Sequence, residues 1–191
     1  MQEPVQREPV KLPKKFILYI GTRYSYKNFD RFAKAFSLLS SKDKELYAIC
    51  TGSPFSSNEE KLFESLCIQG KIIHIQASDP LLYTLYNQAE AFVFPSLYEG
   101  FGIPILESYA CRCPAIISNA SCFPEIASDA AAYFNPYSEI EMAETIASVI
   151  YNNTLRTELI HKGLKQLKLY SWEKAAHQTK EVYLKVLKEN R

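Results

Sequence analysis

The sequence predicts a doubly wound α/β domain with a parallel sheet and C-terminal helices. Two observations lead to this prediction. Continuous apolar runs of four or five residues recur along the chain, as expected for strands buried on both faces of a parallel sheet. The stretches between these runs carry apolar residues at helical spacing, and strands that alternate with helices are typical of βαβ units.

Six apolar runs are expected to form the strands. The first run ends at Gly21, and the second leaves into the turn-forming segment Thr51-Gly52-Ser53-Pro54. The fourth run leads into a glycine-containing loop that holds Glu99. The six predicted strands cover residues 16–20, 46–50, 71–75, 91–94, 114–117 and 131–134.

Capping residues predict where the first three helices begin. Asn28 is expected to cap a helix whose apolar side chains recur from residue 29 to residue 39. Ser57 and Glu60 form the pattern of a capping box, and Gly70 is expected to end the helix that they open. Asp79-Pro80 provides a cap followed by a proline at the first helical position, so a third helix is expected there.

The remaining helices follow from the same signals. Pro104 suits the first turn of a helix that runs to about residue 110, and residues 124–127 are expected to form a short helical turn. Ser138 with Glu141 repeats the capping-box pattern before a helix to about residue 151, and another helix is expected at about 154–167. Ser171 is expected to cap a last helix with a partial apolar stripe, which comprises Trp172, Ala175, Ala176, Val182, Tyr183 and Val186.

The composition is that of a globular domain and disfavours several classes of partner. With 191 residues the chain suits one well-cored domain, and 47% hydrophobic with 23% charged residues is neither a disordered nor a fibrous composition. A formal net charge of +1 gives no electrostatic reason to expect nucleic acid or an acidic membrane as a partner. Residues 1–15 carry three prolines among charges and no apolar run. We therefore expect a linker there, with neither a signal peptide nor a membrane anchor, and a domain over residues 16–191.

The cysteines and histidines predict no metal site. The five cysteines form no paired pattern, and Cys111 and Cys113 are separated by one residue, which is not the C-x₂-C spacing of zinc ligands. The three histidines are far apart in the sequence and form no H-E-x-x-H pattern. The cysteines are therefore expected to be small buried apolar residues in a reducing cytosol.

Three common nucleotide-binding or catalytic motifs are absent from the sequence. No G-x-G-x-x-G follows a predicted strand, which disfavours a nicotinamide or flavin enzyme. No G-x₄-G-K-[ST] is present, which argues against a P-loop hydrolase. The nucleophile elbow G-x-S-x-G is also missing.

The loop after the first strand is a candidate anion site. Arg23 and Lys27 lie beside Gly21, just ahead of a predicted helix N-terminus. A guanidinium, an ammonium and free backbone amides at such a place would suit a diphosphate. The alternative, on this loop alone, is that both are solvated cations of an ordinary surface loop.

A second candidate follows the fourth strand, where Gly100, Gly102 and Pro104 lie between Glu99 and Glu107. The glycines permit backbone conformations and a close ligand approach that side chains would prevent. Glu99 is expected in the loop and Glu107 about one turn into the helix. The carboxylates would face hydroxyl groups or a developing cation, while the amides between them would face an anion. A nucleoside diphosphate sugar offers both hydroxyl groups and an anion. The alternative is that Glu99 is a surface charge and Glu107 is a partner of the helix dipole.

Several segments occur together and in order: Tyr19-Ile20-Gly21-Thr22-Arg23, Lys27-Asn28, Pro95-Ser96-Leu97-Tyr98-Glu99-Gly100-Phe101-Gly102-Ile103-Pro104 with Glu107, Cys113-Pro114-Ala115-Ile116, Phe123-Pro124-Glu125-Ile126 and Tyr170-Ser171-Trp172. With them, residues 16–191 resemble the C-terminal, donor-binding half of a retaining glycosyltransferase of the GT-B type, family 4, also called group 1. The most specific element is E-x₇-E with G-F-G inside it. Arg112 departs from the pattern, since many relatives have glycine there.

The resemblance implies a Rossmann-like half of a GT-B fold and a role for each motif residue. Gly21, Arg23 and Lys27 would hold the diphosphate of the donor. Glu99 would be the catalytic residue, in contact with the transferred sugar near the reacting centre. The cations and the helix dipole would stabilise the departing nucleoside diphosphate, so neither a metal nor another cofactor is expected.

The resemblance also implies contacts to the rest of the donor. Phe101, Gly102 and Ile103 would offer backbone amides to sugar and phosphate. Glu107 would bind the ribose hydroxyls, and Gln76 would lie beside the base. The donor would be a UDP-sugar or a GDP-sugar, with a mannosyltransferase-like pattern favouring GDP-mannose as one option.

The function implied is retaining transfer of a hexose to a glycan or lipid-linked acceptor. The acceptor-binding N-terminal domain is missing and would act in cis or in trans, so this chain is expected to be an excised or truncated part, inactive alone. A cytoplasmic location is expected, with membrane association only through the missing half. The alternatives are a non-catalytic nucleotide-sugar-binding module or partner subunit, and a nucleotide-sugar epimerase.

Overall fold

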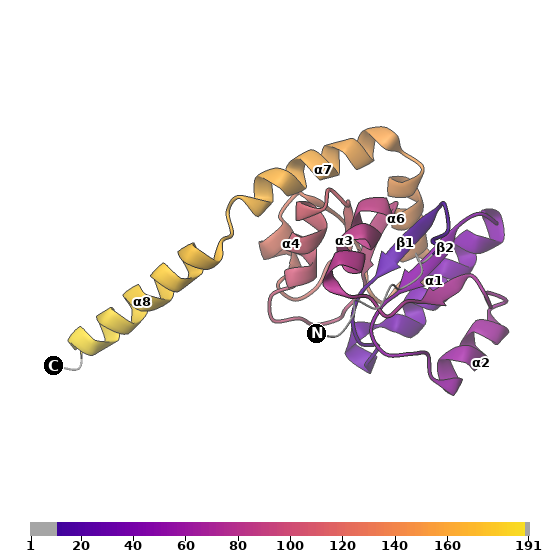
Figure 1. Ribbon diagram of the computed structural model, residues 1–191, viewed down its shortest axis with the longest axis horizontal. Helices are drawn as coiled ribbons and strands as arrows, with labels where there is room; N and C mark the ends of the chain where they lie inside the picture. The colour runs from indigo at the N-terminus through magenta and orange to yellow at the C-terminus, as the bar shows by residue number, and fades with distance from the viewer. Residues whose placement is uncertain (1–10, 190–191) are drawn as a thin grey trace, which may run out of the picture.

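A computed structural model describes residues 11–189 and contains a parallel sheet in the order β3-β2-β1-β4-β5-β6 (Figure 1). The strands are β1 (Phe16–Tyr19), β2 (Tyr47–Cys50), β3 (Ile72–His74), β4 (Ala91–Phe94), β5 (Ala115–Ser118) and β6 (Ala131–Phe134). Leu18 in the middle of β1 lies between Ile49 and Phe92 of the two neighbouring strands. Because the strand order reverses between β1 and β4, the loops that follow them diverge there, as they do at ligand sites of open α/β sheets.

The predicted doubly wound fold is confirmed. Strands β4 and β6 have the predicted bounds, and the other four differ by one residue at one or both ends. The helices are η1 (Ser25–Lys27, a 3₁₀ turn), α1 (Phe29–Lys42), α2 (Ser57–Ser65), α3 (Asp79–Gln88), α4 (Ile103–Ala110), α5 (Phe123–Ala127), α6 (Glu139–Ile150), α7 (Asn153–Leu167) and α8 (Trp172–Glu189).

Both faces of the sheet are buried. Ile17 and Tyr19 of β1 pack into one apolar cluster with α1, α2 and α6. Phe16 and Leu18, which point to the opposite face, pack into a second cluster with α3, α4 and α5. This two-sided burial is why the strands are continuously apolar instead of alternating.

Two helix starts differ from their predictions. The capping box is formed by Ser56 and Glu59, one residue before the predicted pair, and Glu59 also accepts a hydrogen bond from the guanidinium of Arg23. Helix α3 includes Asp79, and the residue before it, Ser78, takes the N-cap position without a side-chain cap bond.

One helix end and one capping pattern also differ. Helix α2 ends at Ser65, five residues before the predicted end at Gly70. Cys67, just after the end of the helix, adopts a left-handed conformation with φ 55°. At α6 only half of the predicted box forms: the Ser138 side chain accepts from the Glu141 amide, but the Glu141 carboxylate accepts from the amide of Asn135. The predicted Ser171 cap is confirmed by a 3.1 Å bond from the Lys174 amide.

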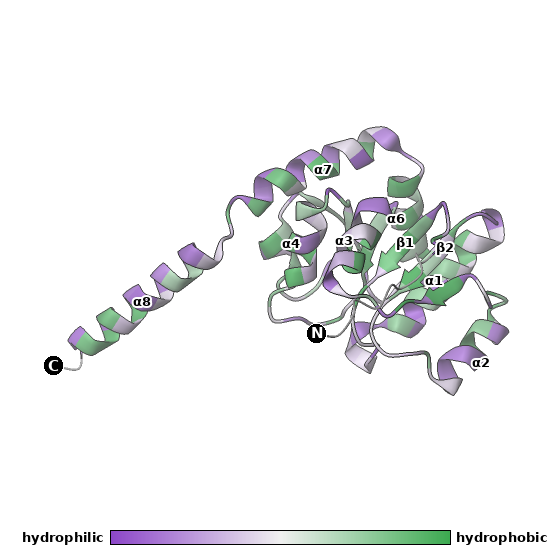
Figure 2. Cartoon of the chain, in the orientation of Figure 1, coloured by the Kyte–Doolittle hydropathy of each residue, from purple (hydrophilic) through white to green (hydrophobic). Residues whose placement is uncertain are grey.

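The last helix extends away from the rest of the domain (Figure 1). Helix α8 has no buried residue, and its first residue, Trp172, is 82% exposed. Apolar and polar residues alternate along it (Figure 2), so the predicted stripe is present but faces solvent. Among residues 11–189, no helix has both the length and the apolar character that a membrane span requires.

The chain before β1 is partly described. Residues 1–10 of the predicted linker lie outside the described residues. Leu12 packs against the cluster that contains α3 and α4, and the Lys15 ammonium donates to Asp43 Oδ2 at 2.7 Å. The Tyr151 hydroxyl, at the end of α6, donates to the same oxygen at 2.7 Å. Asp43 thus connects the segment before β1 with the ends of α1 and α6.

Asp43 is expected to make the free energy of unfolding depend on pH in the acidic range. The hydrogen bond from Lys15, with that from Tyr151, lowers the pKa of Asp43 from 3.8 to about 2. A folded-state pKa below the unfolded value stabilises the protein fully above pH 3.8, and the contribution disappears as the pH falls through 2.

We expect Asp43→Asn to lower the free energy of unfolding by about 1 kcal/mol at neutral pH and to flatten its acid dependence between about pH 4 and 2. Urea denaturation at several pH values measures both. Asp129→Asn is the control, since its ion pair with Lys162 is largely exposed and should contribute much less. Equal effects of the two variants would contradict the role of Asp43.

Candidate ligand-binding site

A hollow of about 330 Å³ lies at the carboxyl ends of β1 and β4. Its walls come from the loop after β1, the last residue of β4, the loop after β4 and the start of α4. The lining residues are Ile20, Gly21, Lys27, Phe94, Glu99, Phe101, Gly102, Ile103 and Pro104. The structure therefore brings together six of the predicted site residues: Gly21, Lys27, Glu99, Phe101, Gly102 and Ile103.

An ion pair crosses this hollow. The Lys27 ammonium donates to Glu99 Oε1 at 2.5 Å, and the side chains are 14% and 16% exposed. The ammonium also lies over the rings of Phe94 and Tyr26, at 5.5 and 5.4 Å from their centroids. A backbone hydrogen bond of 2.8 Å from Leu97 to Tyr26 joins the two loops beside the pair. A cation and a carboxylate thus face one small, partly apolar space.

The loop that carries Glu99 is fixed through its backbone. The Ser121 hydroxyl donates to Glu99 O at 2.8 Å, and the Cys122 thiol contacts the carbonyl oxygens of Glu99 and Phe101 at 3.3 Å. Gly102 has a φ of 96°, and a Cβ there would lie 3.1 Å from Ile105 and 3.2 Å from Phe123. Glycine is therefore required at this position.

Gly100 differs from its prediction. The φ of Gly100 is not positive, unlike that of Gly102. A Cβ added to Gly100 would meet nothing within 4 Å. Of the two glycines that frame Phe101, only Gly102 is needed for the shape of the loop.

Asn28 is a site residue whose role the sequence did not reveal. It precedes α1 as predicted, but its side chain makes no cap bond and its φ is 58°. The buried amide nitrogen donates to Pro95 O at 3.1 Å and to Pro136 O at 2.7 Å. Asn28 thereby holds the loops after β1, β4 and β6 together, directly beside Lys27.

Arg23 lies outside the hollow, and its side chain is only 5% exposed. Its guanidinium donates to the Glu59 carboxylate, to Thr51 O at 3.2 Å, and to Ser53 O and Pro54 O at 2.6 and 2.9 Å. Four of its five N–H groups are committed to acceptors on the loop after β2 and on α2. Arg23 therefore joins the loop after β1 to the loop after β2.

Glu59 completes this contact. Partial burial alone would raise the pKa of Glu59, but hydrogen bonds from the Ser56 amide and from Arg23 outweigh burial and lower it. Gly52 brings the same two loops together, because a Cβ on it would lie 2.5 Å from the carbonyl oxygen of Gly21.

The two residues predicted to contact the nucleoside also lie outside the hollow. Glu107 is in the second turn of α4, and its Oε2 accepts from the Tyr86 hydroxyl at 3.1 Å. Gln76 is exposed after β3, which β2 separates from β1 in the sheet. Tyr86, like Asn28, was not singled out from the sequence as a site residue.

The cysteines divide into two groups. Cys50, Cys111 and Cys113 are buried as predicted, whereas Cys67 is exposed and Cys122 half-buried, so the prediction is wrong for these two. Between residues 11 and 189, no three or more His, Cys, Asp and Glu residues are grouped as metal ligands would be.

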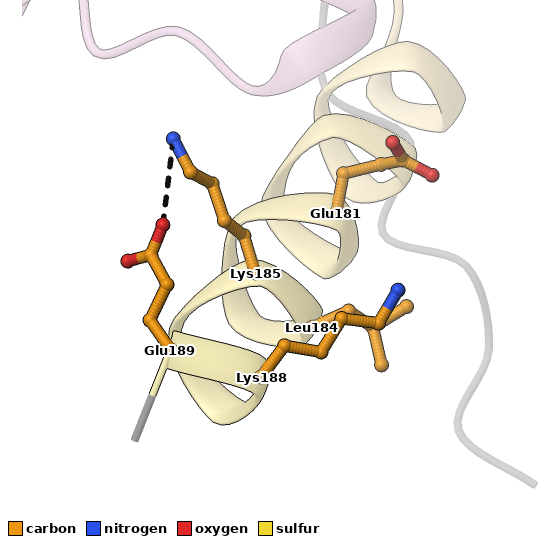
Figure 3. A pocket seen from close by; sticks show the side chains of 5 residues that line it. All are labelled: Glu181, Leu184, Lys185, Lys188 and Glu189. Atoms are coloured by element: carbon orange, nitrogen blue, oxygen red, sulfur yellow. Dashed lines mark ion pairs between the residues drawn. The ribbon is translucent and has the colours of Figure 1, made fainter. Parts of the chain in front are cut away.

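A second hollow, of about 400 Å³, lies along the end of α8 (Figure 3). Its lining residues, Glu181, Leu184, Lys185, Lys188 and Glu189, all belong to one exposed helix. With no second wall to enclose a ligand, this hollow is a surface feature, and the candidate site is the one at β1 and β4.

The doubly wound parallel sheet defines a domain of the Rossmann-like class, with a hollow at its switch point that a cation and a carboxylate line. The family then follows from sequence: residues 2–166 match the family described as "Glycosyl transferases group 1". The chain belongs to this family, and the resemblance inferred from its motifs is confirmed.

Known proteins agree with this assignment. The chain is 31% identical over 172 residues to O-antigen chain mannosyltransferase B of Escherichia coli, a match that covers 88% of this chain and 45% of that protein. It therefore spans less than half the length of this relative. Sucrose-phosphate synthase from Thermosynechococcus elongatus has a similar fold, with a TM-score of 0.80 at 21% identity over 92% of this chain and 46% of that one.

A third comparison concerns a single domain. The C-terminal domain of a glycosyl transferase group 1 family protein, LpcC of Francisella tularensis, aligns with a TM-score of 0.71 at 24% identity. The alignment covers 83% of this chain and 87% of that domain. The fold is thus that of one domain of these larger enzymes.

We expect Arg23→Met to lower the free energy of unfolding by about 2–4 kcal/mol, because it leaves the largely buried Glu59 carboxylate and several carbonyls without a donor. Urea denaturation measures the loss. Lys34→Met is the control: its ion pair with Glu139 is 3.9 Å long and its side chain is 50% exposed, so a change below about 1 kcal/mol is expected. A loss for Arg23→Met no larger than for Lys34→Met would contradict a structural role for Arg23.

Proposed function

We propose that this chain is the donor-binding domain of a retaining glycosyltransferase that transfers a hexose from a nucleoside diphosphate sugar. The observation that carries the proposal is the Lys27–Glu99 pair beside the first residues of α4. A diphosphate needs positive charge and N–H donors, and a sugar needs acceptors for its hydroxyls. The residues that line the hollow offer both.

The start of α4 supports diphosphate binding. Pro104 has no N–H, and the Ile105 amide donates to Gly102 O at 2.9 Å. The amides of Phe101, Gly102 and Ile103 have no hydrogen-bond partner among the described residues, so they are available to a ligand. Amides at a helix N-terminus favour anions, and Lys27 adds a full charge beside them. Together they would stabilise the leaving nucleoside diphosphate.

Glu99 is the proposed catalytic residue. In the free domain its carboxylate is held by Lys27. When phosphates take over the ammonium, the carboxylate becomes available to the hydroxyls of the transferred sugar and to positive charge that develops at its reacting carbon. The Lys27–Glu99 ion pair would thus be replaced by two contacts to one ligand, from Lys27 to the phosphates and from Glu99 to the sugar.

Arg23 enters the proposal as a positioning residue. To contact phosphate it would have to leave Glu59 and the three carbonyl groups that it now binds. Held as it is, it fixes the loop after β1, from which Lys27 extends. Glu107 and Gln76 are proposed to contact the ribose and the base.

The donor and the partner domain complete the proposal. The similarity to an O-antigen chain mannosyltransferase favours a GDP-mannose-like donor over other hexose donors. The acceptor would be bound by a domain outside this chain, so the chain alone binds donor without transferring sugar. We propose a cytoplasmic location, with any contact to the inner face of the membrane made by that domain.

We expect the chain to bind at least one of UDP, GDP and ADP, and Lys27→Met to weaken binding by about 1.5–3 kcal/mol through loss of a charge-assisted contact. Isothermal titration calorimetry measures both and identifies the base. Lys34→Met, an exposed lysine of α1 outside the hollow, should leave affinity unchanged. The donor site is refuted if none of the three nucleotides binds.

Whereas Lys27→Met should weaken binding, Glu99→Gln should strengthen the binding of inorganic pyrophosphate. Removing the carboxylate frees Lys27 and removes a negative charge next to the phosphates, so affinity should rise about two- to fivefold. Calorimetry with pyrophosphate tests this. A loss as large as that of Lys27→Met would show that Glu99 does not compete with phosphate for the lysine.

A further inference from the structure

Tyr86 joins α3 to the start of α4. Its ring is 2% exposed and packs edge-on against Phe92 of β4, with ring centroids 5.5 Å apart. Its hydroxyl lies 3.2 Å from Pro104 O and 3.1 Å from Glu107 Oε2. The tyrosine therefore reaches from one helix to a carboxylate on the next.

The Tyr86 hydroxyl is a donor to this carboxylate. Burial, with the nearby charge of Glu107, raises the pKa of Tyr86 far above its usual value, so the proton stays on the phenol. The hydroxyl has one hydrogen and two acceptors within reach, and the ionised carboxylate is the stronger acceptor. Glu107 Oε2 is thus fixed, while Oε1 has no hydrogen-bond partner among the described residues.

This arrangement places Glu107 next to the hollow. Pro104 lines the hollow, and Glu107 is three residues further along α4, so the two lie on one face of the helix about one turn apart. The Tyr86 hydroxyl spans the gap between them. A ligand that extends from the hollow along this face would meet Oε1 of Glu107.

We propose that Tyr86 is a positioning residue for Glu107: it holds one carboxylate oxygen so that the other accepts hydrogen bonds from hydroxyl groups of the bound ligand. Resting on the proposed function, this assigns those hydroxyls to the ribose of a nucleoside diphosphate. Tyr86 does not touch the ligand, and its effect passes through Glu107.

The test compares two ligands and four variants by calorimetry. The ligands are inorganic pyrophosphate, which lacks hydroxyl-bearing sugar, and whichever of UDP, GDP and ADP binds most tightly. The variants are Tyr86→Phe, Glu107→Gln, the double variant and Tyr109→Phe. Tyr109 is the matched control, because it is also a buried tyrosine next to Glu107 on α4, but its hydroxyl has no partner among the described residues.

Tyr86→Phe should weaken nucleotide binding about ten- to a hundredfold, as expected for loss of one hydrogen bond to a charged group, and leave pyrophosphate binding within about twofold. Tyr109→Phe should change neither. The double variant should bind nucleotide no more weakly than Glu107→Gln alone, because Tyr86 acts through that carboxylate. Thermal unfolding of each variant confirms that it is folded.

Three results would overturn the inference: unchanged nucleotide affinity in Tyr86→Phe, equal losses for nucleotide and pyrophosphate, or additive losses in the double variant. If Glu107→Gln weakens nucleotide binding while Tyr86→Phe does not, the inference fails and the proposed function stands. If the unmodified chain binds no nucleotide, the proposed function fails and takes this inference with it.

Discussion

The buried side-chain amide of Asn28 ties three loops together at the carboxyl edge of the sheet, and the candidate site depends on it. Its oxygen accepts from Arg31, and its nitrogen donates two hydrogen bonds, to Pro95 O and Pro136 O, that water cannot replace because the side chain is buried. They set where the loop after β1 lies relative to the loop after β4. Lys27, the residue before it, is thereby brought opposite Glu99, and the hollow forms around that pair.

Two cations of one loop have different tasks because their side chains differ. The planar, multiply donating guanidinium of Arg23 suits several fixed acceptors at once, and it holds the neighbouring loop. The single ammonium of Lys27 binds one carboxylate, that of Glu99. In the proposed function the arginine keeps the site in shape, and the lysine meets the ligand. In the same proposal Tyr86 of α3 supports Glu107 of α4.

Much of the fold could be predicted from sequence, because apolar strands and capped helices are local signals. The six strands followed from these signals, the family followed from the ordered motif segments, and the E-x₇-E segment pointed to the loop beside the hollow. Tertiary contacts decided the rest. The sequence predicts Arg23 as a diphosphate ligand, but no local pattern predicts its contact with Glu59, 36 residues away. The Ser56–Glu59 and Ser57–Glu60 patterns are equivalent in sequence, and of the two carboxylates it is Glu59 that accepts from Arg23. The Asn28 and Tyr86 bonds likewise join distant segments, which no local pattern reports.

The most direct test of the central claim is a crystal structure of this chain with a bound nucleoside diphosphate. The account predicts that the diphosphate lies within hydrogen-bond distance of Lys27 Nζ and of the amides of residues 101–103. It also predicts that the Lys27–Glu99 contact is opened or shared and that Arg23 remains on Glu59. A nucleotide bound elsewhere, with the Lys27–Glu99 pair intact and the hollow free of phosphate, would contradict it.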